Sequence, residues 1–392
     1  MMKRALLLFA LLLPFLSGAA RGLPRYPFVD LERNVLSAPA GQSRTYQLFR
    51  QKLDTLVITG RGNVRVLHVG GSHVQGGTWT DRLRRNFLAL RYGMDGGRGM
   101  VFPFAVAQTN TPSSYSSSCT GNWESARCLH PDREMGLCGM AATALDTSAR
   151  AMIDLLPRTW RPMQQRYTFN RVQLLGYGDM EPVLLLQKKD TLRGIPTADG
   201  WRFDLPCYMD WVQLAFAPPL GNYTVRGLYL DKSCGGFTLC EAGVNGASTQ
   251  SWLNCEDWES DLSLVHPDLV IFSIGINDIQ GKDFDVAKFK SNYRALCKMV
   301  RRTNPLCAIL FTGINDSYSR KNLNPHTPEV EKACRELAAE FKGVCWDLYA
   351  LMGGAGSVVS WQDAGLMQPD KVHFTPEGYR LIGDLLFDAM MK

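Results

Sequence analysis

The first residue that could carry chemistry is Ser72. It follows two glycines and the apolar run 64–69, which has the length and composition of a buried strand. A helical stretch comes soon after it, with Thr78 or Thr80 as the expected N-cap. A serine in such a strand–turn–helix unit lies at the carboxyl end of a strand, where open α/β sheets bind ligands. Ser72 is therefore a candidate nucleophile, although a helix N-cap serine would explain the same local pattern.

A serine hydroxyl needs a general base, and the sequence offers His373 for this task. His373 ends the motif Asp-Lys-Val-His, which begins at Asp370. This spacing lets the carboxylate reach back to one imidazole nitrogen, so that the other nitrogen can take a proton from the serine. A surface histidine beside a capping turn is the alternative. His73 is expected to shape the site instead, because neighbouring side chains on a turn diverge.

Two further residues could donate hydrogen bonds to a developing oxyanion. Asn277 follows the apolar run 269–274 within Gly-Ile-Asn-Asp, and its side-chain amide can donate. Gly246, in Gly-Val-Asn-Gly-Ala, gives close access to a backbone N–H. The N–H of Ser72 would be the third donor, and one such donor contributes on the order of 3 kcal/mol. Glycine and asparagine are also the commonest turn residues, so each signal alone is weak.

The order of these residues along the chain resembles the sequence blocks of the SGNH (GDSL-type) hydrolase superfamily. The resemblance implies a nucleophilic serine, a histidine base with its orienting aspartate, and an oxyanion hole of three N–H donors. It assigns these roles to Ser72, His373 and Asp370, with Ser72, Gly246 and Asn277 as the donors. No cofactor and no metal belong to this mechanism.

Two features of the sequence depart from a simple match. Gly71 precedes the serine where the family usually has an aspartate, a supporting residue whose loss could loosen the nucleophile turn. The Gly-Ile-Asn-Asp sequence of 275–278 also recurs at 313–316. The second copy lies where the family usually has a variable substrate-side loop, so the match uses the first.

The closer resemblance is to the peptidoglycan O-acetylesterase branch of this superfamily. It rests on Gly71–His73, Gly97–Gly99 and Gly243–Ala247, and on room for a carbohydrate-binding-module-like β insert. It implies an exported serine esterase that removes O-acetyl groups from a glycan, with peptidoglycan muramic acid preferred. The alternatives are an O-acetyltransferase or another carbohydrate esterase with the same triad, and a glycan-binding protein with weakened activity.

The chain is predicted to form an α/β domain interrupted by a β-rich module. Short β-like segments at 167–175, 182–187, 200–205, 211–217 and 223–230 predict an antiparallel sandwich or jelly roll, entered through a polar loop at 109–120. The flanking parts predict a three-layer, flavodoxin-like hydrolase domain with a parallel sheet. The expected divisions are a signal peptide (1–20), the hydrolase domain in two parts (22–110 and 236–392) and the insert (111–235).

The N-terminus predicts export to the periplasm or the exterior. A basic start is followed by twelve apolar residues, 5–16, and by the small residues 17–20, which is the layout of a secretory signal peptide. Twelve residues are too few to cross a membrane, which takes about 20. The net charge of +6 falls to +4 without Lys3 and Arg4, and no basic stripe with interleaved aromatics predicts nucleic-acid binding.

Eleven cysteines in an exported chain favour disulfides, with at least one thiol left over. The candidate pairs are Cys297–Cys307 and Cys334–Cys345, each joining a predicted helix to the following strand. Cys119, Cys128 and Cys138 would staple the loop that enters the insert. The partner implied by the resemblance is an O-acylated glycan, and the sequence does not indicate an oligomeric state.

Overall fold

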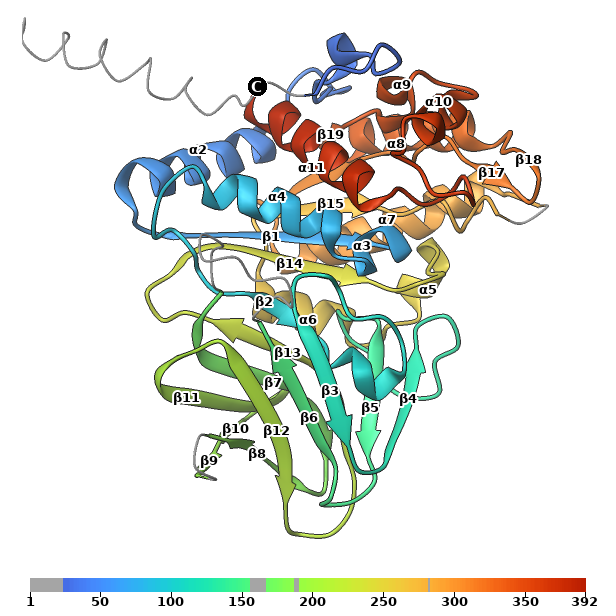
Figure 1. Ribbon diagram of the computed structural model, residues 1–392. Coiled ribbons are helices and arrows are strands. Elements are labelled where there is room, and N and C mark those ends of the chain that lie inside the picture. The colour runs from blue at the N-terminus through green and yellow to red at the C-terminus, as the bar shows by residue number, and fades with distance from the viewer. Residues whose placement is uncertain (1–23, 156–166, 187–189, 281–282) are drawn as a thin grey trace, which may run out of the picture.

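The computed structural model describes residues 24–155, 167–186, 190–280 and 283–392. The predicted signal peptide therefore lies outside the described residues. The chain forms two regions: a parallel sheet covered by helices, and a pair of antiparallel sheets below it in the view of Figure 1. The predicted α/β domain with a β-rich insert is confirmed.

The parallel sheet has five strands in the order β14-β1-β15-β16-β19. Counted along the chain, this is the order 2-1-3-4-5, which is typical of flavodoxin-like sheets. The strands are nearly continuous apolar runs because helices cover both faces of the sheet. Their bounds are β1 (Asn63–Gly70), β14 (Gly236–Gly243), β15 (Leu269–Ser273), β16 (Ala308–Phe311) and β19 (Val344–Cys345).

Helices form the two outer layers of this domain. One layer contains α2 (Arg44–Thr59), α4 (Thr78–Leu88) and α11 (Pro376–Met391), and the other contains α6 (Trp258–Val265), α7 (Val286–Thr303) and α8 (Thr327–Glu340). The shorter helices are η2 (Leu31–Arg33), α3 (Ser72–Gln75), η3 (Phe104–Ala107), α5 (Thr249–Leu253), α9 (Leu348–Met352) and α10 (Ser357–Asp363).

The predicted N-cap of α4 is wrong. Thr78 is the first residue of α4, and its N-cap is Gly77, whose positive φ of 76° turns the chain between α3 and α4. Thr80 lies inside the helix, where its hydroxyl is 3.0 Å from Nδ1 of His68 on β1. The threonine side chain therefore serves a buried contact with the sheet rather than the helix end.

The antiparallel region consists of two packed sheets. One contains β10-β11-β7-β13-β5-β4 with β2 against β13, and the other contains β3-β6-β12-β8-β9. Aromatic pairs such as Trp123–Phe216 join them. The bounds are β2 (Gly99–Val101), β3 (Ser116–Thr120), β4 (Trp123–Arg127), β5 (Met140–Ala144), β6 (Arg150–Asp154), β7 (Phe169–Gly178), β8 (Glu181–Leu185), β9 (Thr191–Arg193), β10 (Ile195–Thr197), β11 (Gly200–Met209), β12 (Trp211–Ala217) and β13 (Tyr223–Asp231).

Two details of this region differ from the simplest sequence interpretation. The end of the polar segment 109–120 forms the edge strand β3, because its backbone pairs with β6 while its side chains stay largely exposed. Strand β2, which precedes the predicted boundary at 111, also joins the antiparallel sheet. The domain boundaries therefore stay predictions, although the arrangement of two units is clear.

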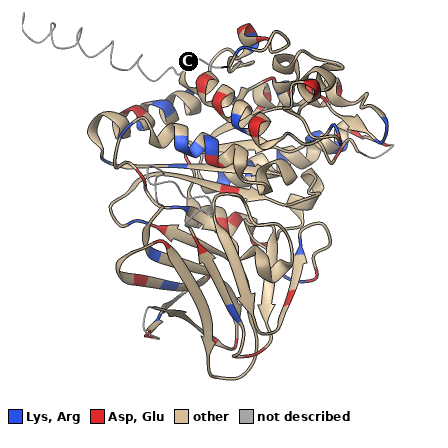
Figure 2. Cartoon of the chain, viewed as in Figure 1, with Lys and Arg blue, Asp and Glu red and all other residues tan. Residues whose placement is uncertain are grey.

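Buried charges join the antiparallel region to the α/β domain. Arg226 on β13 contacts Asp257 and Asp261 at α6. We call this contact the seam. Arg226 pairs with Asp257, and its Nη2 is 3.7 Å from Asp261 Oδ1, while Asp261 Oδ2 accepts the Leu137 N–H at 2.7 Å. Elsewhere, basic and acidic residues are interspersed in both regions (Figure 2).

The predicted disulfides are wrong, because all eleven cysteines carry free thiols. Eight of them are buried, including both members of Cys297–Cys307 and of Cys334–Cys345. They pack in the core as small apolar side chains. Burial raises the pKa of Cys240 to about 11, so that thiol stays protonated at neutral pH. In the ranges that the structure describes, no helix is long and apolar enough to cross a membrane.

Candidate active site

Three neighbouring strands end at one level and bring three predicted site segments together. Gly70 is the last residue of β1, and it pairs with Gly243 of β14 on one side and with Ser273 of β15 on the other. Ser72 follows two residues after this row. Gly246 and Asn277 follow within four residues of the other two strand ends. This is the point where the strand order reverses, at which open α/β sheets bind their ligands.

The structure also brings the serine, the histidine and the aspartate together. Ser72 Oγ lies 2.7 Å from His373 Nε2, although 301 positions separate the two residues. His373 Nδ1 lies 2.7 Å from Asp370 Oδ2. The other oxygen of that carboxylate accepts the backbone N–H groups of Val372 and His373, both at 2.9 Å. The aspartate is thus fixed by its own loop, and Ser72 is not an N-cap but the first residue of α3.

The environment favours an ionised Asp370. Partial burial opposes ionisation, but the N–H groups of His373 and Val372 outweigh it and hold the pKa of Asp370 below its ordinary value. An ionised carboxylate accepts a hydrogen bond from the Nδ1–H of His373, which leaves Nε2 to accept a hydrogen bond from the Ser72 hydroxyl. About a third of the His373 side chain remains exposed, so substrate and water can reach this pair.

The three predicted oxyanion donors lie on the segments that follow β1, β14 and β15. Asn277 Nδ2 donates to the carbonyl of Ala247 at 2.9 Å, which leaves its second hydrogen available. Gly246 has a φ of 82°, a left-handed conformation that favours glycine. Within the part of the chain that the structure describes, the N–H groups of Ser72 and Gly246 have no hydrogen-bond acceptor. In these ranges, each of the three predicted donors therefore keeps an N–H hydrogen without a protein acceptor.

The glycine that replaces the family aspartate has a structural explanation. A Cβ atom at Gly71 would lie 3.0 Å from Asn277 Nδ2 and 3.4 Å from the Ala247 carbonyl. The first distance is closer than side-chain carbons normally tolerate. Gly71 therefore lets the Asn277 amide pack directly against the nucleophile turn.

Sequence reasoning missed residues that hold the donor segments in place. Gln75 Oε1 accepts the Asn245 N–H at 2.6 Å, and its Nε2 donates to the Asn110 carbonyl at 2.9 Å. The carboxylate of Asp278 accepts the Thr249 hydroxyl at 2.6 Å, and burial raises its pKa to about 6. Their only sequence signal is that Gln75 and Asp278 stand within three residues of a predicted site residue.

His73 lies against the candidate base. Its ring stacks on His373 with 5.1 Å between centroids, and its Nδ1 is 2.9 Å from the Tyr379 hydroxyl on α11. Burial, with a smaller effect from His373, lowers the pKa of His73 to about 3. The neutral imidazole of His73 therefore packs against the His373 imidazole, which would exchange protons with Ser72.

The insert reaches the candidate site through apolar packing. A Cβ atom at Gly246 would lie 2.9 Å from Cδ2 of Leu129, which precedes β5. Asn254, after α5, donates to the Cys128 carbonyl at 2.9 Å. None of the predicted site residues belongs to the insert, but its 128–129 segment supports the turn that carries Gly246.

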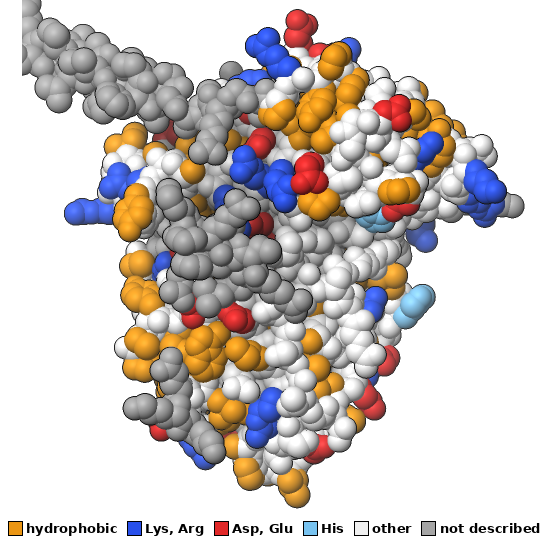
Figure 3. Space-filling model, viewed as in Figure 1, with side chains coloured by type: hydrophobic (Ala, Val, Ile, Leu, Met, Phe, Trp, Pro, Cys, Tyr) orange, Lys and Arg blue, Asp and Glu red, His pale blue; other side chains and the backbone are white. Residues whose placement is uncertain are grey.

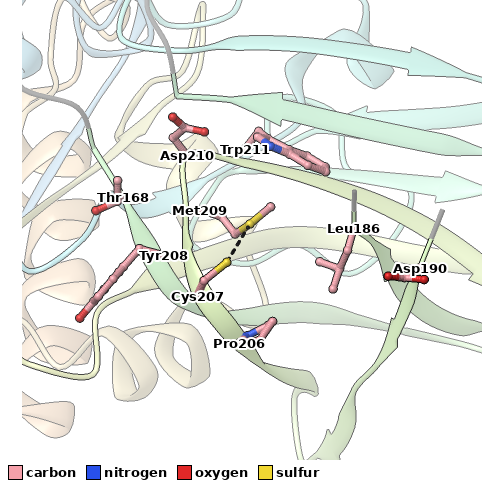
Figure 4. A pocket seen from close by; sticks show the side chains of 9 residues that line it. All are labelled: Thr168, Leu186, Asp190, Pro206, Cys207, Tyr208, Met209, Asp210 and Trp211. Atoms are coloured by element: carbon pink, nitrogen blue, oxygen red, sulfur yellow. Dashed lines mark hydrogen bonds between the residues drawn. The ribbon is translucent and has the colours of Figure 1, made fainter. Parts of the chain in front are cut away.

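A separate hollow of about 500 Å³ opens on the antiparallel region (Figure 4). Tyr208 and Trp211 line it beside Asp190 and Met209. On the face shown in Figure 3, hydrophobic side chains gather over this part of the molecule. The hollow contains none of the predicted site residues. No cluster of three or more potential metal ligands occurs among the residues whose positions are described.

The fold and this arrangement at the strand ends define an α/β protein of the ester hydrolase class. Residues 198–381 match the GDSL-like lipase/acylhydrolase family. A comparison with curated protein sequences finds no match.

Among solved structures, the chain is similar to a peptidoglycan O-acetylesterase, with a TM-score of 0.74 and 22% identity over 91% of this chain and 98% of that one. It is also similar to an acetyl xylan esterase (TM-score 0.32, 21% identity, 39% and 81% covered). A GDSL-like lipase from Parabacteroides merdae gives a TM-score of 0.33 at 21% identity, with 40% and 73% covered. At these identities the likeness concerns the fold.

Proposed function

We propose that this protein is a serine esterase that removes O-acetyl groups from a glycan, with the muramic acid of peptidoglycan as its preferred substrate. The observation that carries the proposal is the continuous chain from Ser72 through His373 to Asp370, with 2.7 Å at each link. The choice of glycan is supported by the likeness to a peptidoglycan O-acetylesterase over 91% of the chain, insert included.

In the proposed mechanism, Ser72 Oγ attacks the acetyl carbonyl and passes its proton to His373 Nε2. The carbonyl oxygen becomes an oxyanion that accepts hydrogen bonds from Ser72, Gly246 and Asn277. When the intermediate collapses, the C–O bond to the sugar breaks, and His373 returns its proton to the sugar oxygen. A water molecule then attacks the acetyl-enzyme with His373 as base, and acetate leaves with Ser72 restored.

The role proposed for Asp370 is electrostatic and positional. Its carboxylate holds the Nδ1 proton, so that Nε2 faces the serine, and it stabilises the imidazolium that forms after proton transfer. Together with the predicted signal peptide, the proposed substrate places this reaction outside the cytoplasm, in the periplasm or beyond. That location is part of the proposal.

The direct test is Ser72→Ala, assayed with a chromogenic acetyl ester and by acetate release from O-acetylated wall sacculi. Because the nucleophile is lost, we expect activity to fall by roughly 10³-fold or more with the free energy of unfolding nearly unchanged. Ser113→Ala is the matched control, since Ser113 donates its N–H to the Gly76 carbonyl beside the turn but lies outside the triad. Unchanged esterase activity in Ser72→Ala would contradict the mechanism.

The same purified protein separates the alternatives. Acetate released from sacculi but not from acetylated xylan supports the peptidoglycan assignment, and the reverse result overturns it. Acetyl transfer to an added glycan in place of acetate release would identify an acyltransferase that uses the same triad. Glycan binding without any ester cleavage would identify a binding protein.

A further inference from the structure

The proposed mechanism assigns no role to the second Gly-Ile-Asn-Asp sequence, at 313–316. Residues 313–324 begin two residues after the end of β16, which pairs with β15 in the sheet. They continue into a small hairpin of β17 (Tyr318–Ser319) and β18 (Asn322–Leu323). We call residues 313–324 the brace.

The brace binds the loop that carries the candidate base. Asn315 Nδ2 donates to the carbonyl of Val372 at 3.1 Å, and the Tyr318 N–H donates to the carbonyl of Lys371 at 3.0 Å. These are the two residues between Asp370 and His373. Lys371 has a φ of 55°, which non-glycine residues adopt only where the surroundings hold them, and its Nζ lies 4.3 Å from the centroid of the Tyr318 ring.

The brace also binds the loop that carries the oxyanion donor. Asn324 Nδ2 donates to the Ile279 carbonyl at 2.9 Å, and Gln280 Nε2 donates to the Tyr318 carbonyl at 3.3 Å. Ile279 stands two residues after Asn277. One short segment is thus hydrogen-bonded to both loops that the proposed reaction needs in register.

The inner side of the brace is fixed to the core. The Ile314 N–H donates to Oε1 of the buried Glu331 at 2.7 Å, and the Asp316 carboxylate accepts the Val358 N–H at 3.1 Å. At Gly313, where φ is 61°, a Cβ atom would lie 2.2 Å from the same Glu331 oxygen. Gly313, Asn315 and Asp316 of the repeated sequence therefore each make a different contact, and each contact explains why that residue type is present.

We propose that Asn315 is a positioning residue: through the Val372 carbonyl, the brace sets the place of the His373 imidazole relative to Ser72 and to the Asn277 donor. This inference rests on the proposed function. Asn315 is almost fully buried, and its Nδ2 donates to the Val372 carbonyl of the loop and to the Asp316 carbonyl of the brace, so any effect on Ser72 passes through the loop and the base. Misplacing a catalytic group by about 1 Å costs on the order of 100-fold in rate, so a single lost anchor is measurable.

The test compares Asn315→Leu with Asn304→Leu on a small acetyl ester. Asn304 is a matched control because it is also buried and donates to a backbone carbonyl, that of Pro267, at 2.9 Å, but at the opposite end of the sheet. We expect both variants to lower Tm, and only Asn315→Leu to lower kcat, by about tenfold or more with little change in KM. Equal kcat losses in the two variants would overturn the proposal.

A double mutant separates positioning from general damage. In an Asp370→Asn background the base has already lost its orientation, so adding Asn315→Leu should cost less than about threefold in kcat. Fully additive losses would show that Asn315 does not act through the base. If Asn315→Leu does not fold, Asn315→Ser removes the same contact with a smaller change.

One readout does not depend on turnover. We expect the Nδ1 proton that His373 shares with Asp370 to give a downfield proton NMR signal. Asn315→Leu should shift or broaden this signal, and Asn304→Leu should leave it in place. An unchanged signal in Asn315→Leu would overturn the proposal even if the esterase assignment stands. A shifted signal in a protein that cleaves no ester would instead mean that the positioning is real and the proposed function is wrong.

Discussion

The two regions of this molecule use polar side chains in opposite ways. In the hydrolase domain, Ser72 follows the end of β1, and Asp370 and His373 lie in the loop before α11. The side chains of Asp370 and His373 are 49% and 37% exposed. At the seam, the side chains of Arg226 and Asp261 are 5% and 0% exposed and lie 3.7 Å apart. Exposure leaves the first set free to react, whereas burial commits the second set to structure.

Sheet topology explains why the site forms in only one of the two regions. Parallel strands that end at one level bring together segments from anywhere in the sequence, as in the pairing of Gly70 with both Gly243 and Ser273. Neighbouring antiparallel strands run in opposite directions, so their carboxyl ends lie at opposite edges of the sheet, as in the pairs β4–β5 and β10–β11. The comparison predicts that damage to the seam changes stability and that damage to the strand ends changes activity.

The largest expected effect is on stability, from Arg226→Met. Removing the arginine leaves the buried Asp261 without its cation, a change that typically costs about 3–5 kcal/mol of unfolding free energy. Burial already raises the pKa of Asp261 to about 6, so protonation should relieve part of this cost as the pH falls from 8 to 5. Urea denaturation over this pH range measures both effects, and kcat of the folded variant should change by less than about twofold.

Arg171→Met is the matched control for the seam. Arg171 pairs with Asp204 at 2.9 Å across β7 and β11, but both side chains are more than a third exposed. Exposed pairs contribute about 1 kcal/mol or less, so this variant should be nearly neutral at every pH. A loss as large as that of Arg226→Met would show that burial does not distinguish the two contacts.

The same contrast explains what the sequence could predict. Ser72, Gly246 and Asn277 could be predicted from the sequence for two reasons. Each follows an apolar run that predicts a strand, and each is a residue type that the turn or the catalytic chemistry requires. Gln75 and Tyr379 could not, since their partners Asn245 and His73 become neighbours only through tertiary packing.

The wrong predictions have a physical cause as well. Cysteine spacing carries no information about whether two thiols face one another or the core, and the buried thiols of α7 and α8 face the core. Strand β3 is polar because it lies at a sheet edge with its side chains in solvent, so its composition is that of a loop. The seam pairs charges that stand about 30 residues apart with no periodic signal.

A smaller effect, on activity alone, is expected from Gly71→Ala. The added Cβ would lie 3.0 Å from Asn277 Nδ2, so the amide must shift away from the nucleophile turn. Losing an oxyanion donor completely costs about 10²–10³-fold, and a partial shift should lower kcat by roughly tenfold. The control is Gly76→Ala, whose Cβ would meet the Ser72 carbonyl at an ordinary 3.5 Å and whose φ is −58°. Equal kcat values for the two variants would contradict the proposed role of Asn277.

Near neutral pH, the smallest expected effect concerns the buried histidines of the hydrolase domain. Burial lowers the pKa of both His68 and His73 to about 3, from an ordinary value of 6.5. As the pH falls, the unfolded chain therefore takes up these protons first, and stability is lost from about pH 6.5 down to about pH 3. Each histidine contributes a slope of up to about 1.4 kcal/mol per pH unit.

His73→Asn removes one titrating group, so its unfolding free energy should fall less steeply than that of the wild type. His130→Asn, at an exposed position, is the matched control. The measurement is the urea midpoint of each variant at every half pH unit. A wild-type slope in His73→Asn would mean that His73 is not held neutral against His373. The hydrolase domain would then tolerate a second charge beside its base.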